Sequence, residues 1–179
     1  MTKDEREGIE MFAKVRNSMK KVLCVGLAVT LVLTASTGVT AKGKAKNNSK
    51  ALCGTVIKKT GNSDKLKYTS ENAMDFAALS FADRKKVKNI CYVCDDKEVY
   101  SVCVMIAKDN AGVKKLYAAL KKYKKNNNTG DYLSDYSDSE KKVFKNSIYG
   151  KQGKYVWYIA MSSDKAKNNA GQKALKKAM

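Results

Sequence analysis

The sequence contains no histidine, which narrows the chemistry open to it. Histidine is the commonest general base near neutral pH and a member of the usual serine and cysteine triads, so those triads are excluded. A metal site would have to form without imidazole ligands. No cofactor fingerprint or catalytic motif occurs either. We therefore expect no cofactor, no resident metal and no catalytic residue, and a binding role rather than an enzymatic one.

Arginine is nearly absent beyond residue 41, where 29 of the 30 basic residues are lysine and the exception is Arg84. Proteins that read DNA bases depend on the bidentate guanidinium group, so this scarcity argues against base-specific recognition. Only 13 acidic residues accompany the 30 basic ones, which leaves a net charge of +17. Such a field attracts polyanions nonspecifically, and salt weakens the attraction. The alternative source of the excess lysine is an A/T-rich genome.

The longest apolar run is Val22 to Ala35, and it follows the basic pair Lys20 and Lys21. Small or modest side chains come next, in Val39-Thr40-Ala41. This order is typical of a secretory signal peptide that begins at Met19. We therefore predict a signal peptide over residues 19 to 41 and a secreted or cell-surface protein.

Cleavage is predicted between Ala41 and Lys42, with less suitable alternatives after Ala35 or Ala45. A second interpretation is an uncleaved segment that tethers the protein to the membrane. Fourteen helical residues span only about 21 Å, however, against an apolar bilayer core of about 30 Å. Lipidation is disfavoured because Cys24, the cysteine of this segment, lies inside the apolar run.

The chain divides into four predicted regions. Residues 1 to 18 have mixed charge. Their presence is interpreted as the result of a start codon assigned too far upstream, and the alternative is a genuine cytoplasmic extension. Residues 19 to 41 are the signal peptide. Residues 42 to 66 are predicted to be a basic flexible tether or arm, in which Leu52 to Ile57 forms a strand or an ordered part of the arm. Residues 67 to 179 are predicted to form a single domain.

The first half of that domain shows clear periodic patterns. Thr69 or Ser70 is a candidate cap for a helix whose apolar residues recur at steps of three and four as far as Phe81. Two runs rich in β-branched and aromatic residues, Val87 to Val93 and Val99 to Ala107, predict an antiparallel hairpin. A helix over residues 110 to 124 is then expected after the N-cap Asp109.

The second half repeats the order of strand, strand and helix. It is predicted to contain a short helix over Ser137 to Asn146, a hairpin over Ile148 to Met161 and a last helix capped by Asp164. The segments VYSVCVMIAKDNAGVKKL and YVWYIAMSSDKAKNNAGQKAL both read as an apolar strand followed by an Asp-capped helix. We expect an α+β two-layer sandwich with a four-stranded antiparallel sheet, helices on one face and the order α-ββ-α-α-ββ-α.

This order, together with NAMDFAALSF, DDKEVYSVCVMIAKD and GKYVWYIAMSSDKAKNNAGQKAL, resembles an uncharacterised family of exported proteins from low-GC Gram-positive bacteria. The family is catalogued as a domain of unknown function, and the resemblance spans residues 67 to 179. It implies an extracytoplasmic α+β domain that is often lipid-anchored. This chain departs from the family by lacking the lipid-attachment cysteine and by carrying extra cysteines. No functional residue can be carried over.

Four cysteines remain beyond residue 41: Cys53, Cys91, Cys94 and Cys103. An even number in an exported protein permits disulfides without requiring them. Cys91 and Cys94 have the spacing of a redox pair, but they lie in a predicted strand, where they would point to opposite faces. A zinc site would require all four cysteines to converge.

The hairpin loop decides whether Cys91 forms a disulfide. If the hairpin closes through Asp96 to Glu98, Cys91 lies directly opposite Cys103, and these two form the candidate disulfide. A four-residue loop would instead place Cys91 opposite Val102. In the other interpretation, the cysteines stay reduced and serve as small buried hydrophobic residues.

Carboxylates are the remaining candidates for hydrolytic chemistry. They cluster in two places that could hold a hard cation or transfer protons, namely Asp131, Asp135, Asp138 and Glu140 in one segment and Asp95 and Asp96 at a hairpin tip. The calcium-loop spacing with its central glycine is missing. Aspartate and serine are also common in turns and helix caps for purely structural reasons.

Lysines off the apolar stripe of the helix over residues 110 to 124 are the candidate polyanion contacts: Lys114, Lys115, Lys121, Lys122, Lys124 and Lys125. We expect an exported or surface domain that binds anionic envelope polymers or another surface protein. It would have no specific nucleic-acid partner and would touch the membrane only through an uncleaved signal segment. The alternatives are an exported hydrolase that uses carboxylates or a metal, and a nonspecific nucleic-acid-binding protein.

Overall fold

A computed structural model describes residues 48–63, 66–68 and 81–179 of the chain. The predicted signal peptide, the residues before it and the helix predicted from Thr69 or Ser70, apart from its end at Phe81, lie outside these residues. Within the described part, no helix is both long enough and apolar enough to cross a membrane.

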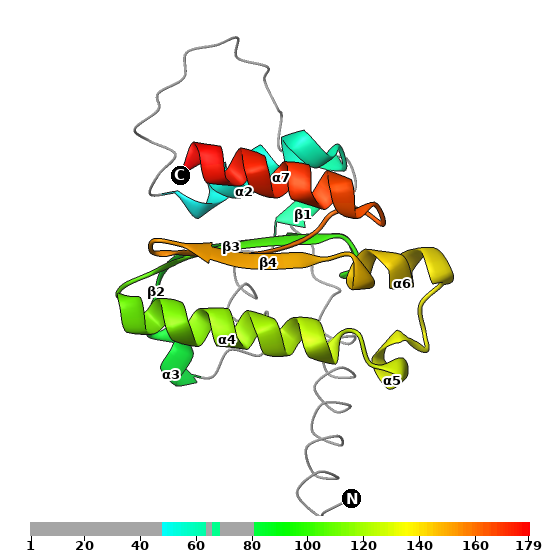
Figure 1. The fold of residues 1–179 in the computed structure, drawn as a ribbon, viewed down its shortest axis with the longest axis horizontal. Coiled ribbons are helices and arrows are strands. Elements are labelled where there is room, and N and C mark those ends of the chain that lie inside the picture. The colour runs from blue at the N-terminus through cyan, green and yellow to red at the C-terminus, as the bar shows by residue number, and fades with distance from the viewer. Residues whose placement is uncertain (1–47, 64–65, 69–80) are drawn as a thin grey trace, which may run out of the picture. The chain divides into compact units, whose positions relative to one another are not determined.

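The described residues form an antiparallel sheet with the strand order β1-β2-β3-β5-β4, and helices pack against it (Figure 1). The strands are β1 (Lys67–Tyr68), β2 (Val87–Cys94), β3 (Ser101–Ala107), β4 (Ile148–Gln152) and β5 (Tyr155–Ala160). The helices are α2 (Ser49–Thr60), α3 (Phe81–Arg84), α4 (Asn110–Asn126), α5 (Gly130–Leu133), α6 (Asp138–Lys145) and α7 (Lys165–Ala178). The α+β class and the two predicted antiparallel hairpins are confirmed, and the two-residue β1 adds a fifth strand at one edge.

Helices cover both faces of the sheet, so the prediction of two layers with helices on one face needs correction. On one face α2 and α7 enclose a core that contains Leu52 and Leu175. On the other, α4, α5 and α6 pack over a second core that contains Leu116 and Phe144. The physical reason lies in β3, all seven residues of which are buried. A strand that is apolar on both sides needs cover on both sides.

Helix α2 occupies the segment predicted as a basic tether or arm. Its residues Leu52, Cys53, Val56 and Ile57 recur at steps of one, three and one and pack on the sheet face shared with α7. This spacing places four apolar side chains on one side of a helix, which is why the segment folds as a helix and not as a strand. Gly61, in the left-handed conformation at φ 83°, caps its C-terminal end.

Two of the predicted helix caps, Asp109 and Asp164, are confirmed. The Asp109 carboxylate accepts a hydrogen bond of 2.6 Å from the Gly112 N–H and starts α4. Asp164 accepts one of 2.8 Å from the Ala166 N–H at the start of α7. These carboxylates satisfy backbone donors that the helices themselves leave without a partner.

Helix α6 begins with a capping box that depends on pH. Ser137 and Glu140 exchange hydrogen bonds, and Lys97 forms an ion pair of 3.1 Å with Glu140. The hydrogen bonds from Ser137, reinforced by Lys97, lower the pKa of Glu140 from 4.5 to about 2. The stabilisation is therefore present above pH 4.5 and is lost as the pH falls toward 2.

We expect Glu140→Gln to reduce the loss of stability on acidification across this interval, because glutamine has no proton to gain. Urea unfolding midpoints measured at several pH values between 4.5 and 2 will test this. Asp131→Asn is the matched control, since that exposed carboxylate lies outside the capping box. Equal acid sensitivity in the parent protein and Glu140→Gln would contradict the assignment.

Candidate anion-binding site

Most of the predicted polyanion contacts on α4 lie on its exposed side. The apolar residues Val113, Leu116 and Leu120 face the sheet, and the exposed lysines lie off that stripe: Lys114, Lys115, Lys121, Lys122 and Lys125. Lys115 also lies 3.9 Å from the Asp83 carboxylate, so part of its charge is compensated within the protein. The exposed side of α4 is therefore a strongly basic surface.

Lys124 differs from the other predicted contacts because it is half-buried. Its ammonium group donates a hydrogen bond to the backbone carbonyl of Ser147. Burial, with a smaller contribution from nearby Lys165, lowers the pKa of Lys124. Lys124 therefore joins α4 to the residue that precedes β4, and we exclude it from the ligand-contacting set.

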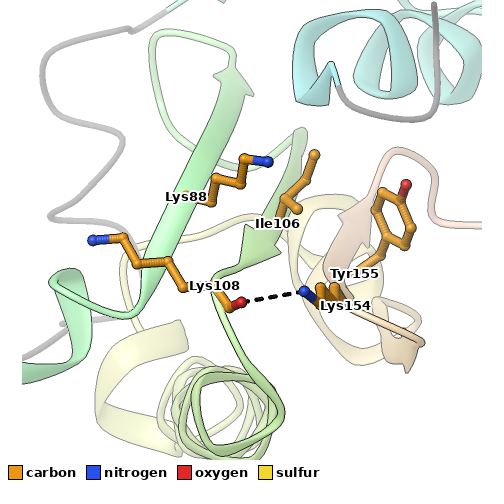
Figure 2. A pocket seen from close by; sticks show the side chains of 5 residues that line it. All are labelled: Lys88, Ile106, Lys108, Lys154 and Tyr155. Carbon is orange, nitrogen blue, oxygen red and sulfur yellow. Dashed lines mark hydrogen bonds between the residues drawn. The ribbon is translucent and has the colours of Figure 1, made fainter.

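A hollow of about 340 Å³ lies at the end of the sheet where β2 begins and β3 ends (Figure 2). It is lined by Lys88, Ile106, Lys108, Lys154 and Tyr155. We call this set the lysine hollow. None of its members was among the sequence-predicted site residues, because they come from three separate segments of the chain.

Strand pairing brings these segments together. Ile106 of β3 lies opposite Tyr155 of β5, and the Ala107 N–H donates a hydrogen bond of 2.8 Å to the carbonyl of Lys154. The Lys154 ammonium group points at the Lys108 carbonyl, 3.4 Å away, while the side chain of Lys108 extends away from it (Figure 2). The backbone thus fixes where each lysine side chain starts.

The register between β2 and β3 shifts between Val87 and Asn89, which is where Lys88 lies. Irregularities of this kind change the direction in which a side chain points, compared with the regular alternation of a strand. Lys88 is exposed and contributes the third ammonium group to the lysine hollow. Its position therefore depends on local sheet geometry as well as on sequence.

The composition of the lysine hollow suits an anion. Three lysines line the hollow together with Ile106 and Tyr155, and none of the described residues that line it is acidic. Lysine is a flexible, strongly hydrated point charge, suited to a phosphate or carboxylate group without strict geometry.

Two of the carboxylates considered for hydrolysis, Asp95 and Asp138, have structural partners. Asp95 accepts hydrogen bonds of 2.8 and 3.1 Å from the N–H groups of Val99 and Tyr100 and so shapes the hairpin loop. Asp138 forms an ion pair of 3.6 Å with Lys141. In the part of the chain that the structure describes, no three acidic or cysteine side chains are placed to hold a metal ion together.

The strand register contradicts the predicted disulfide between Cys91 and Cys103. Cys91 lies opposite Val104, and Cys103 lies opposite Tyr92. The loop between β2 and β3 runs from residue 95 to 100, which is longer than either loop considered. Cys91 consequently points to the α2 side and Cys103 to the α4 side. Cys91 and Cys94 also point to opposite faces, as predicted.

Comparison with known proteins adds no assignment to these surfaces. No protein-family model, curated protein or solved structure matches the chain. The function must therefore be inferred from the lysine hollow, the basic side of α4 and the predicted export signal.

Proposed function

We propose that this chain is an exported or cell-surface binding domain that holds anionic polymers of the cell envelope. The observation that carries the proposal is the lysine hollow, a partly apolar recess lined by Lys88, Lys108 and Lys154, with no acidic residue among the described residues that line it. A single phosphate or carboxylate group of a polymer would bind there, with its neighbouring carbon atoms against Ile106 and Tyr155.

The basic side of α4 supports a polymer rather than a single small anion as the ligand. Exposed lysines along this helix provide further charges that repeated anionic groups can meet at several places. Each exposed contact contributes little, so affinity would come from many weak contacts together. The scarcity of arginine fits recognition by charge without fixed geometry.

The predicted export of the protein indicates which kind of anionic polymer it would meet. The segment from residue 19 to 41 predicts a signal peptide, and the resemblance to an exported family points to the same compartment. Outside the cytoplasmic membrane of a Gram-positive cell, envelope polymers rich in phosphate and carboxylate groups are abundant anions. Nucleic acid would be the corresponding ligand only if the protein stayed inside the cell.

The test is to replace the three lysines of the hollow together, as Lys88→Gln, Lys108→Gln and Lys154→Gln. We expect about tenfold weaker binding to immobilised poly(glycerol phosphate), because three weak charge contacts are lost together. Binding by the parent protein is also expected to weaken as the salt concentration rises. Equilibrium binding at low and at high salt measures both effects.

The matched control removes three exposed lysines outside the hollow, as Lys58→Gln, Lys145→Gln and Lys177→Gln. It has the same net charge as the first variant and should keep most of the affinity. Equal loss in both variants would show that only net charge matters and would overturn the hollow as a site. Tighter binding to double-stranded DNA than to the polymer would favour the nucleic-acid alternative.

A further inference from the structure

The thiol groups of Cys53 and Cys91 meet where α2 packs on β2. The Cys53 thiol lies 3.4 Å from the backbone carbonyl oxygen of Cys91 and donates a hydrogen bond to it, although the two residues are 38 positions apart. Both side chains belong to the core on the α2 and α7 face of the sheet. The fold therefore brings two distant thiols together at one helix–strand contact.

The other two described cysteines do not share this environment. Cys94 and Cys103 belong to the core on the α4 face, across the sheet from Cys53 and Cys91. None of these four described cysteines forms a disulfide in the structure. A side chain on one face of a sheet cannot reach a thiol on the other without disrupting the strand. Cys53 and Cys91, in contrast, share both a face of the sheet and a contact.

The two thiols differ in how readily they ionise and in how accessible they are. A hydrogen bond from the Cys53 thiol lowers the pKa of Cys91, burial opposes this effect, and the nearby Lys50 ammonium group adds to it. Burial raises the pKa of Cys53 well above its ordinary value. Cys91 is 8% exposed, whereas Cys53 is 0% exposed. An incoming reagent therefore meets Cys91 first, and Cys91 is also the better thiolate.

We propose that Cys53 and Cys91 are an oxidisable pair that forms an intramolecular disulfide by exchange with a disulfide-bearing oxidant, either a small-molecule disulfide or a thiol–disulfide oxidoreductase. This modification site is separate from the lysine hollow and does not depend on the proposed ligand. It also replaces the pairing of Cys91 with Cys103 that the register contradicts.

The exchange is balanced in two steps. The Cys91 thiolate attacks one sulfur of the oxidant, which breaks the oxidant's S–S bond, forms a mixed disulfide and releases one thiol. The Cys53 thiol then loses its proton and attacks the Cys91 sulfur, which forms the new S–S bond and releases the second thiol. Two thiols of the protein are oxidised while the oxidant disulfide is reduced to two thiols.

The bond would hold α2 on the sheet. Helix α2 precedes every described strand in the chain and is otherwise attached by side-chain packing and a few hydrogen bonds, such as that of 2.9 Å from the Ser49 N–H to the Asn89 side chain. A link across 38 residues also removes conformational freedom from the unfolded chain. Oxidation should therefore protect α2 from opening.

The test uses the purified full-length chain in buffers of oxidised and reduced glutathione, followed by alkylation under denaturing conditions and trypsin digestion without reductant. We expect peptide Ala51–Lys58 to be recovered linked to peptide Asn89–Lys97 in most molecules. Fragmentation between Tyr92 and Val93 assigns the link to Cys91 rather than Cys94. The rate of the first step, formation of the mixed disulfide at Cys91, should rise with pH and level off below pH 9.0, the ordinary thiol value, because the pKa of Cys91 is lowered. Closure also requires ionisation of Cys53, whose pKa is raised by burial, so closure should keep accelerating at higher pH.

Two variants make the outcome decisive. Cys103→Ala removes a buried thiol from the opposite core and should leave the linked peptide unchanged, whereas Cys91→Ser should abolish it. Recovery of unlinked peptides at every glutathione ratio would overturn the proposal. A stable glutathione adduct on Cys91 without closure, or a link through Cys94 or Cys103, would overturn it equally.

Discussion

Replacement of Trp157 by alanine is expected to lower the free energy of unfolding by about 4 kcal/mol. Trp157 is the largest fully buried side chain and lies in β5, on the sheet face covered by α2 and α7. Removing an indole ring from a packed core loses its apolar burial and leaves a cavity that neighbouring residues fill only in part.

The neighbours of the ring explain why the cavity would persist. A Cβ atom at Gly150 of β4 would come within 2.5 Å of Trp157 Cζ2, so the ring rests directly on the backbone of the adjacent strand. A glycine has no side chain that could move into the vacated space. On the helix side, the Lys176 ammonium group lies 5.8 Å from the ring centroid and would lose that contact.

Urea unfolding followed by far-ultraviolet circular dichroism measures this loss, since Trp157 is the chain's single tryptophan and cannot report on its own absence. Trp157→Phe is the matched variant, with an expected loss of only about 1–2 kcal/mol. The buried indole Nε1 has no hydrogen-bond partner among the residues that the structure describes, so phenylalanine gives up no hydrogen bond. A loss below about 1 kcal/mol for Trp157→Ala would contradict the packing described.

Replacement of Asn168 by alanine is expected to cost about 3 kcal/mol of stability. Asn168 is a fully buried polar side chain in the first turns of α7. Its oxygen accepts a hydrogen bond of 3.0 Å from the Met161 N–H, and its nitrogen donates bonds of 2.9 Å to the carbonyls of Asn146 and Ser162. This one amide joins the end of α6, the end of β5 and the start of α7.

The cost is large because alanine would leave these three backbone groups without their partner in a place that Asn168 shields from water. Each unsatisfied buried group costs about 1–3 kcal/mol, although relaxation and water entry recover part of it. The same denaturation measurement applies, with Asn169→Ala as the control because Asn169 is adjacent but exposed. Equal unfolding midpoints for the two variants would contradict the structural role of Asn168.

The elements that the sequence predicted well are those with local signals. Asp109 and Asp164 cap helices where expected, because an N-cap and the helix it starts are neighbours in the chain. The hairpin strands were likewise recognisable from their β-branched and aromatic residues. Helix α2 was missed because its basic flanks suggested a tether, although the spacing of Leu52 and Val56 carried the helical signal.

The predicted disulfide between Cys91 and Cys103 was wrong, because the register that decides it depends on a loop whose length the sequence leaves open. The Asp95 side chain accepts hydrogen bonds from two residues on the far side of the loop, and Glu98 adopts a left-handed conformation at φ 57°. Together they widen the loop and shift the register away from Cys103. The lysine hollow depends on register in the same way, since pairing of β3 with β5 brings Lys108 and Lys154 together.

The placement of α4 and α7 on opposite faces also bears on the origin of the fold. In β2-β3-α4 and in β4-β5-α7, a hairpin leads into a helix, and the second strands of the two units are antiparallel neighbours. Each unit can be turned so that its helix faces the observer and its second strand points up. In that view, the first strand lies to the left of the second strand in one unit and to the right of it in the other. The units therefore have opposite hands, and no rotation superimposes them. Their similar sequences reflect a shared local rule, an apolar strand followed by an Asp-capped helix, and not the duplication of an ancestral unit.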